Sequence, residues 1–302
     1  MHFNVFYNRV ASVKRENITA KEVVNPMRID AHQHYWRITR GDYGWITPEL
    51  KRLYRDFLPD DLEPLLSKHK LDGSILVQAA PTLEETMCIL SIAAEQPSVL
   101  GVVGWLDLFD PNHRSHYEQC CTHSKYVGFR IMIQDMKDST CILEPRFIEA
   151  LREYAALKVP IDLLVSSHQL EDVIAMLKQV PTLRGVIDHI GKPPIKEGLL
   201  EPWASHLSEI SRFPNIYCKL SGMVTEADHA AWKAMDFIPY IRHVLQEFGS
   251  SRVMYGSDWP VCLLAGDYDE VMDILTAALP SKWSGAERLR LFGLNAKEFY
   301  KL

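Results

Sequence analysis

Short apolar runs alternate with longer amphipathic stretches along the chain from Met27 onward. The apolar runs are nearly continuous in Val, Ile and Leu, as at residues 74–77 and 161–165. Strands that are covered on both faces of a parallel sheet have this composition. Every gap between consecutive runs is long enough for a helix. The predicted strands are residues 28–36, 73–80, 99–108, 126–133, 159–165, 184–190, 215–220 and 251–257.

The gaps between the predicted strands carry helix signals. Thr82 precedes an amphipathic stretch and has Glu85 three residues after it, which is the pattern of a capping box. Residues 170–180 repeat apolar side chains at helical spacing, and the pattern stops at Pro181. Strands and helices are therefore expected to alternate.

Eight strand–helix units without a flexible linker predict an α/β fold, a single (β/α)8 TIM barrel, over residues 27–302. The competing fold is an open doubly wound sheet, which usually carries a glycine-rich phosphate loop; neither G-x-G-x-x-G nor G-x-x-x-x-G-K-[ST] occurs. Residues 1–26 lack the apolar core of a signal peptide and are expected to be an N-terminal extension outside the barrel.

Composition excludes several classes of function. The 302 residues are 47% hydrophobic and 24% charged, with a formal net charge of −6 and no block of basic residues. No apolar stretch reaches the ~20 residues that span a bilayer. We therefore expect neither a nucleic-acid nor a membrane partner. The six cysteines form no C-x-x-C pair, which favours reduced thiols and a cytoplasmic location.

The first strand supplies two histidines at its carboxyl end, where barrel enzymes carry their chemistry. Residues two apart on a strand share a face, so Asp30, His32 and His34 are expected to point the same way. Two converging imidazoles could bind one ion or polarise one oxygen. The alternative is a pair of exposed histidines, but an apolar barrel strand has no solvated face.

The sixth and eighth strands end in further candidates. His189 follows Asp188 and precedes a Gly-Lys-Pro turn, which suits a metal ligand or a hydrogen-bond donor; the alternative is a passive histidine beside a capping aspartate. Asp258 follows Gly256 and a serine, which permit close approach of backbone or substrate. Asp258 could be a metal ligand, a general base or both, or merely an N-cap for the segment beginning at Pro260.

Four more residues are candidates for substrate binding. Arg130 ends the fourth strand, and its planar fork could hold a substrate oxygen unless it pairs with Asp135. Lys219, Trp36 and His168 lie at or just beyond the ends of other strands. The sequence has no G-x-S-x-G and no H-E-x-x-H motif, which disfavours a serine hydrolase or a metalloprotease of those types.

Five of these segments, taken together and in order, resemble the amidohydrolase superfamily. Within it they are similar to the branch of sugar lactonases typified by L-fuconolactonases and L-rhamnonolactonases. The resemblance extends from Met27 to the last residue. The segments are residues 28–36, 128–130, 188–193, 218–228 and 256–264.

The resemblance implies hydrolysis of a sugar-acid lactone, L-fuconolactone or a close aldonolactone, to the open aldonate. By analogy Asp258 takes the proton from water. His32, His34 and His189 then hydrogen-bond the carbonyl oxygen or bind a divalent ion together with Asp258. Ester cleavage needs a base and an electrophile, and either arrangement supplies both.

The sequence departs from relatives that hold two metal ions. Those relatives carry a bridging Lys or Glu on the fourth strand and a His on the fifth. Here Arg130 and Ile131 end the fourth strand, and residues 161–165 contain no His. The expected cofactor is therefore a single divalent ion, zinc before others, or none.

Several alternatives stay open at the level of sequence. Among enzymes they are an L-rhamnonolactonase, a pyrone dicarboxylate lactonase and a metal-dependent decarboxylase; outside enzymes, a non-catalytic binding barrel. A dianionic substrate calls for several cations. Only Arg130 and Lys219 stand at strand ends, so a neutral sugar lactone is favoured as the small-molecule partner. Assembly into a homo-oligomer is left open.

Overall fold

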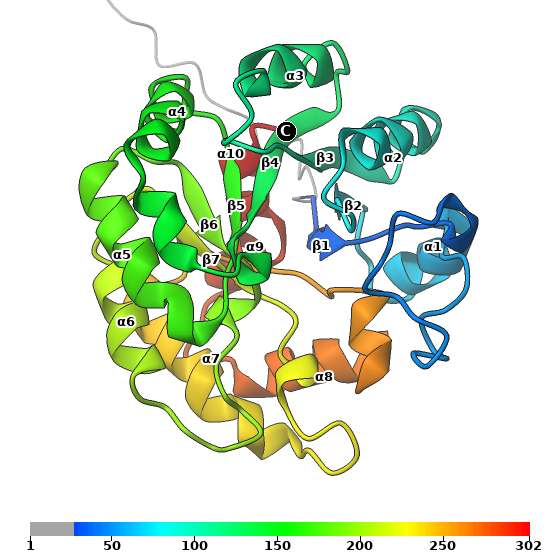
Figure 1. Ribbon diagram of the computed structural model, residues 1–302. Helices are drawn as coiled ribbons and strands as arrows, with labels where there is room; N and C mark the ends of the chain where they lie inside the picture. Colours follow the sequence, from blue (N-terminus) through cyan, green and yellow to red (C-terminus); the bar gives the residue numbers. More distant parts are fainter. Residues whose placement is uncertain (1–26) are drawn as a thin grey trace, which may run out of the picture.

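A computed structural model describes residues 27–302 of the protein (Figure 1). Eight parallel strands form one sheet in the order of the sequence. The predicted N-terminal extension, residues 1–26, lies outside the described residues. The strands are β1 (Ile29–Gln33), β2 (Gly73–Val77), β3 (Val99–Trp105), β4 (Tyr126–Met132), β5 (Ile161–Leu164), β6 (Gly185–Ile187), β7 (Ile216–Leu220) and β8 (Val253–Tyr255).

The sheet closes on itself between β1 and the segment that follows β8. The Asp258 N–H donates to the carbonyl of His32 at 2.9 Å, and the His34 N–H donates to the carbonyl of Trp259 at 2.8 Å. Gln33 and Trp259 form a parallel bridge across the same seam. The predicted (β/α)8 barrel is therefore confirmed, and the open doubly wound sheet is excluded.

Helices surround the barrel, as Figure 1 shows. They bury one face against the strands because their apolar residues recur at helical spacing. The helices are α1 (Pro59–Lys68), α2 (Leu83–Glu95), α3 (His113–Cys120), α4 (Pro145–Ala156), α5 (Leu170–Gln179), α6 (Trp203–Ile210), α7 (Ala234–Phe248), α8 (Tyr268–Ala278), α9 (Gly285–Leu289) and α10 (Asn295–Tyr300). In residues 27–302 no helix is long and apolar enough to cross a membrane.

Only half of the predicted capping box forms at α2. The Glu85 N–H donates to the side-chain oxygen of Thr82 at 3.0 Å, as expected. The Glu85 side chain does not return to Thr82; its Oε1 accepts the Ala79 N–H at 3.1 Å. Glu85 is fully buried, and it fixes the loop between β2 and α2 instead of completing the cap.

Most of the strands stop earlier at their carboxyl ends than the apolar pattern predicts. The pattern continues β6 to residue 190 and β8 to residue 257, but the strands end at Ile187 and Tyr255. Beyond these ends the backbone turns left-handed, with φ of 52° at His189 and 57° at Asp258. Both residues therefore lie in loops at the mouth of the barrel.

The helix α10 closes the opposite end of the barrel. Its residues Ala296, Phe299 and Tyr300 pack against the apolar side chains that fill the barrel interior, among them those of Ile75 and Val103. The carbonyl of Phe299 accepts a hydrogen bond at 2.9 Å from Arg184, which precedes β6. Because α10 covers the amino-terminal end of the barrel, a site is expected at the mouth formed by the carboxyl ends of the strands.

Candidate active site

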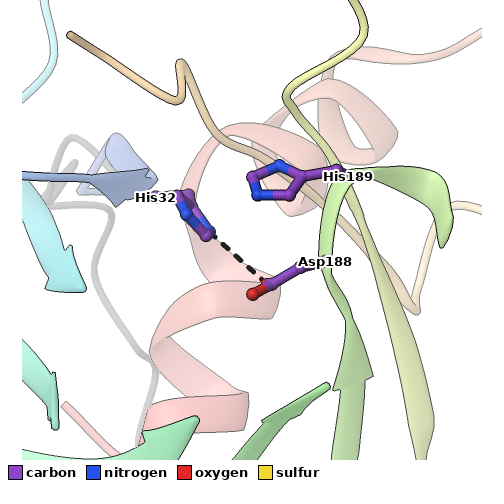
Figure 2. Close-up of side chains that lie close together, drawn as sticks. All are labelled: His32, Asp188 and His189. Carbon is purple, nitrogen blue, oxygen red and sulfur yellow. Dashed lines mark ion pairs between the residues drawn. The ribbon is translucent and has the colours of Figure 1, made fainter. Parts of the chain in front are cut away.

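The predicted residues His32, His34, His189 and Asp258 converge at the mouth. The Nε2 atoms of His32 and His34 are 3.2 Å apart. The Asp258 Oδ1 lies 3.7 Å from His32 Nε2, 3.4 Å from His34 Nε2 and 3.9 Å from His189 Nε2. Figure 2 shows His32, at the end of β1, facing His189 and Asp188 from the segment after β6. All of these side chains are buried.

Asp30 does not join the two histidines, so the expectation that all three share a face is wrong. The register between β1 and β2 shifts between Asp30 and Gln33, which is the mark of a β-bulge. The extra residue sends Asp30 toward α8, where its Oδ2 accepts from the Tyr268 hydroxyl at 2.8 Å. Its Oδ1 accepts the Ser257 N–H at 2.9 Å, which ties β1 to the loop after β8.

Two glycines allow the histidines to come together. A Cβ on Gly222 would lie 2.3 Å from His189 Nδ1, and a Cβ on Gly256 would lie 2.6 Å from His32 Cβ. Real contacts of this kind are longer, so no other residue fits without displacing a histidine. The close approach expected at Gly256 is confirmed, and Gly222 plays the same part opposite His189.

The hydrogen bonds of the rings fix their orientation. His34 Nδ1 lies 2.8 Å from the carbonyl of Val77, which can only accept, so Nδ1 carries the proton and Nε2 presents a lone pair. His189 Nδ1 lies 3.0 Å from the Ser221 hydroxyl. The lone pair of His34 and the carboxylate of Asp258 thus face the same space.

Lys219 lies beneath this group, enclosed by protein side chains. It is fully buried, donates to Asp162, and places its Nζ 3.1 Å from Asp188 Oδ1 and 3.1 Å from His32 Nδ1. The sequence suggested a substrate contact for Lys219, but the side chain is fully buried and engaged by two hydrogen bonds and an ion pair. Asp162, on β5, was not foreseen because nothing in its own strand marks it as a partner of β7.

Arg130 reaches the same cluster from β4. Its Nη1 lies 3.5 Å from Asp188 Oδ2, and its Nη2 donates to the carbonyl of Gln78. The alternative partner considered from the sequence, Asp135, makes no ion pair with it. The Nε of Arg130 is buried and has no hydrogen-bond partner.

The other two candidates lie outside the cluster. Trp36 is buried among aromatic rings and donates from Nε1 to the carbonyl of Arg55 at 2.9 Å. It supports His34, with the ring centres 6.5 Å apart, and is not an open contact. His168 is exposed on the turn Ser167–Gln169 and lines a polar hollow of about 620 Å³ that is formed by the loops after β5, β6 and β7. None of the clustered residues lines this hollow.

Burial sets the charges of the site. It lowers the pKa of His32 and of His189 well below the usual value, because an imidazolium loses its hydration there. Burial alone would raise the pKa of the Asp258 carboxyl, but His189 and His34 outweigh it and hold that pKa below its usual value. The site therefore presents a carboxylate among imidazoles, of which His32 and His189 are neutral.

The residues fit one divalent metal ion. Ligand atoms of His32, His34 and Asp258 lie within 4.8 Å of one another, as do those of His32, His189 and Asp188. Two imidazoles and a carboxylate are a set that zinc takes in hydrolases. His32 Nδ1 is 3.4 Å from Asp188, a carboxylate of the kind that orients ligating histidines from behind.

An eight-stranded parallel barrel with histidines and an aspartate at its mouth defines a metal-compatible hydrolase of the amidohydrolase type. Residues 29–302 match the family model described as Amidohydrolase, and the chain belongs to that family.

Curated relatives and a solved structure agree with this assignment. The L-fucono-1,5-lactonases of Burkholderia ambifaria and Burkholderia multivorans are each 38% identical to the chain, over 91% of this chain and 96% of each relative. A crystal structure of a Burkholderia multivorans amidohydrolase with bound zinc superposes with a TM-score of 0.86 at 38% identity, covering 91% of this chain and 99% of that one.

Proposed function

We propose that residues 27–302 act as one catalytic domain that hydrolyses a sugar-acid lactone, with L-fuconolactone as the substrate, to the open aldonate. The observation that carries this proposal is the Asp258 carboxylate within 3.9 Å of three imidazole nitrogens. A base beside polarising groups is what ester hydrolysis requires. The two lactonases of Burkholderia, at 38% identity, support the substrate class.

Asp258 acts on the attacking water in this mechanism. A water beside the Asp258 carboxylate can donate one hydrogen to it. As the water oxygen bonds to the lactone carbonyl carbon, Asp258 takes its proton. The bond from that carbon to the ring oxygen then breaks, and the proton passes from Asp258 to the departing ring oxygen. The product is the open hydroxy acid.

His32, His189 and Arg130 polarise the carbonyl. Negative charge grows on the carbonyl oxygen as the water adds, and donors fixed in a buried site stabilise it strongly. His32 and His189 line the same space as Asp258, and Arg130 has an unpaired Nε. We propose that Arg130 hydrogen-bonds the carboxyl portion of the lactone.

A zinc ion, when bound by His32, His34, His189 and Asp258, would polarise the same carbonyl as a Lewis acid. The Burkholderia multivorans amidohydrolase that was crystallised with bound zinc supports zinc as the ion.

Charge favours a neutral polyol over a dianion. Arg130 and Lys219 are both paired with Asp188, so neither is a free cation. The polar hollow formed by the loops after β5, β6 and β7 is lined by two lysines and three carboxylates, as well as histidines and serines; the charged residues are Lys192, Lys196, Glu197, Glu226 and Asp228. We place the sugar hydroxyls there. A pyrone dicarboxylate would meet more negative than positive charge.

The decisive experiment is a lactone panel. Acid release is measured from L-fucono-, L-galactono-, D-arabinono- and L-rhamnonolactone and from 2-pyrone-4,6-dicarboxylate, with added zinc and with chelator. We expect the highest kcat/KM on L-fuconolactone. A preference for L-rhamnonolactone or the pyrone would select that alternative, and rates equal to buffer for every lactone would reject the proposal.

Asp258→Asn tests the assigned base. The amide keeps the size of the side chain but cannot accept the proton, so kcat/KM should fall by about 10²–10⁴-fold. The melting temperature serves as the control for folding. An unchanged kcat/KM in a folded variant would remove Asp258 from its role.

A further inference from the structure

A chain of buried hydrogen bonds runs through the barrel from α10 to the mouth. The Tyr300 hydroxyl donates to Asp162 Oδ1 at 2.8 Å. The other oxygen of Asp162 accepts from Lys219, whose Nζ also lies 3.1 Å from His32 Nδ1. All four side chains are buried, with at most 2% of their surface exposed. The helix that closes one end of the barrel is thereby linked to a histidine at the other.

The direction of the hydrogen bonds along this chain is set by its ends. A lysine ammonium has three donors and no acceptor. Lys219 makes hydrogen bonds to Asp162 and His32 Nδ1, and it forms an ion pair with Asp188. Since the ammonium can only donate, His32 Nδ1 is an acceptor and the proton of this ring is on Nε2. At the other end the Val77 carbonyl takes the Nδ1 proton of His34. His32 Nε2–H then donates to His34 Nε2, 3.2 Å away.

We propose that Tyr300, Asp162 and Lys219 are positioning residues that fix His32 in the tautomer with its proton on Nε2. This nitrogen faces His34 and Asp258, so the N–H that His32 gives to His34 in the free site points into the space where the lactone carbonyl would bind. Metal binding through Nε2 needs the opposite tautomer, with the Nδ1 proton turned to Asp188. The part of the proposal that concerns kinetics rests on the proposed lactonase function; the tautomer does not.

The tautomer is measured directly by ring ¹⁵N–¹H NMR on chelator-treated protein labelled at histidine. The signals of His32 are assigned by their loss in His32→Gln. We expect a protonated Nε2 and an unprotonated Nδ1 for His32. A protonated Nδ1 in the wild-type protein would overturn the proposal, whatever the activity.

Tyr300→Phe tests the far end of the chain. Without the hydroxyl, Asp162 loses one donor and draws more strongly on Lys219, which weakens the bond from Lys219 to His32. We expect kcat on the best lactone to fall about tenfold with KM within about twofold, as for groups that orient an active-site residue from behind. Partial appearance of the Nδ1–H tautomer should accompany the fall.

Tyr126→Phe is the matched control. Tyr126 begins β4, near the same end of the barrel, and its buried hydroxyl has no partner. This variant should keep the wild-type kcat and the wild-type spectrum of His32. If Tyr300→Phe matches Tyr126→Phe in both, then Tyr300 does not position His32.

Lys219→Met removes the donor itself. In a folded variant His32 should move its proton to Nδ1, toward Asp188, and retention of the Nε2 proton would contradict the role of Lys219. If two unpaired aspartates prevent folding, the wild-type spectrum and Tyr300→Phe still decide. If no lactone is hydrolysed but His32 is protonated at Nε2, the proposed lactonase function is rejected. The assignment of the positioning residues and of the His32 tautomer is then retained.

Discussion

A single buried carboxyl, Glu85, organises the loop on which two site residues depend. Its Oε1 accepts the Ala79 N–H, and it is fully buried. The carbonyl of Val77, two residues earlier, holds His34, and the carbonyl between them holds Arg130. Burial raises the pKa of Glu85 from 4.5 to about 8, so at neutral pH this group is mostly protonated.

The free energy of unfolding should therefore fall as the pH rises from about 5 to about 8. Between about pH 5 and 8 the folded protein keeps a proton on Glu85 that the unfolded chain releases, so unfolding becomes easier with each unit. Glu85→Gln keeps the acceptor and cannot titrate. We expect the free energy of unfolding of the wild type, relative to Glu85→Gln, to drop on the order of 1 kcal/mol per pH unit.

Urea unfolding of both proteins at pH 5, 6, 7 and 8 measures this difference. Parallel stability curves would show that Glu85 is ionised throughout or is not buried in solution.

At the scale of elements, Gly222 at the start of the loop after β7 sets the position of His189 in the loop after β6. His189 has a left-handed backbone and lies against Gly222, where a Cβ would come within 2.3 Å of its ring. Gly222→Ala should push His189 away from Asp258 and lower kcat/KM by about 10–100-fold, the size seen when an orienting group is lost.

Gly41→Ala is the control for this substitution. Gly41 also has a positive φ, 77°, but a Cβ there meets nothing within 4 Å. Both variants carry the same kind of backbone strain, of about 1–2 kcal/mol. Only Gly222→Ala should lose activity when lactone hydrolysis and thermal melting are compared. Equal activity in the two variants would show that His189 tolerates displacement.

Elements could be predicted from the sequence where the signal is local. The apolar runs located all eight strands, and Thr82 marked the start of α2. The H-x-H pair and Asp258 followed from their place at strand ends. The bulge after Asp30 could not be foreseen, because it depends on how β1 pairs with β2.

The burial of Lys219 could not be predicted either, because it also depends on how the strands come together. Its partners lie on β5, after β6 and on β1, and only the closed barrel brings them together. A single strand shows a lysine at its end, which fits substrate binding as well as burial. The same holds for Trp36, whose aromatic neighbours come from the following loop.

At the scale of the molecule, charge bears on how the substrate arrives. The net charge is −6, and the hollow proposed to hold the sugar hydroxyls has mixed charges. A neutral lactone gains nothing from long-range steering, which salt would screen. We expect kcat/KM to stay within about twofold between 20 and 500 mM NaCl. A steep dependence on salt would indicate an anionic substrate.

The seam that closes the barrel also decides when the site comes into existence. The Ser257 N–H and the Asp30 carboxylate that bind across it are separated by 227 residues. Contacts of such long range form late in folding, since the chain between them must first be ordered. We therefore expect His32 and Asp258 to meet only at the final cooperative step of folding. Recovery of lactone hydrolysis after dilution from denaturant should consequently lag behind recovery of helical circular dichroism and report the completed barrel.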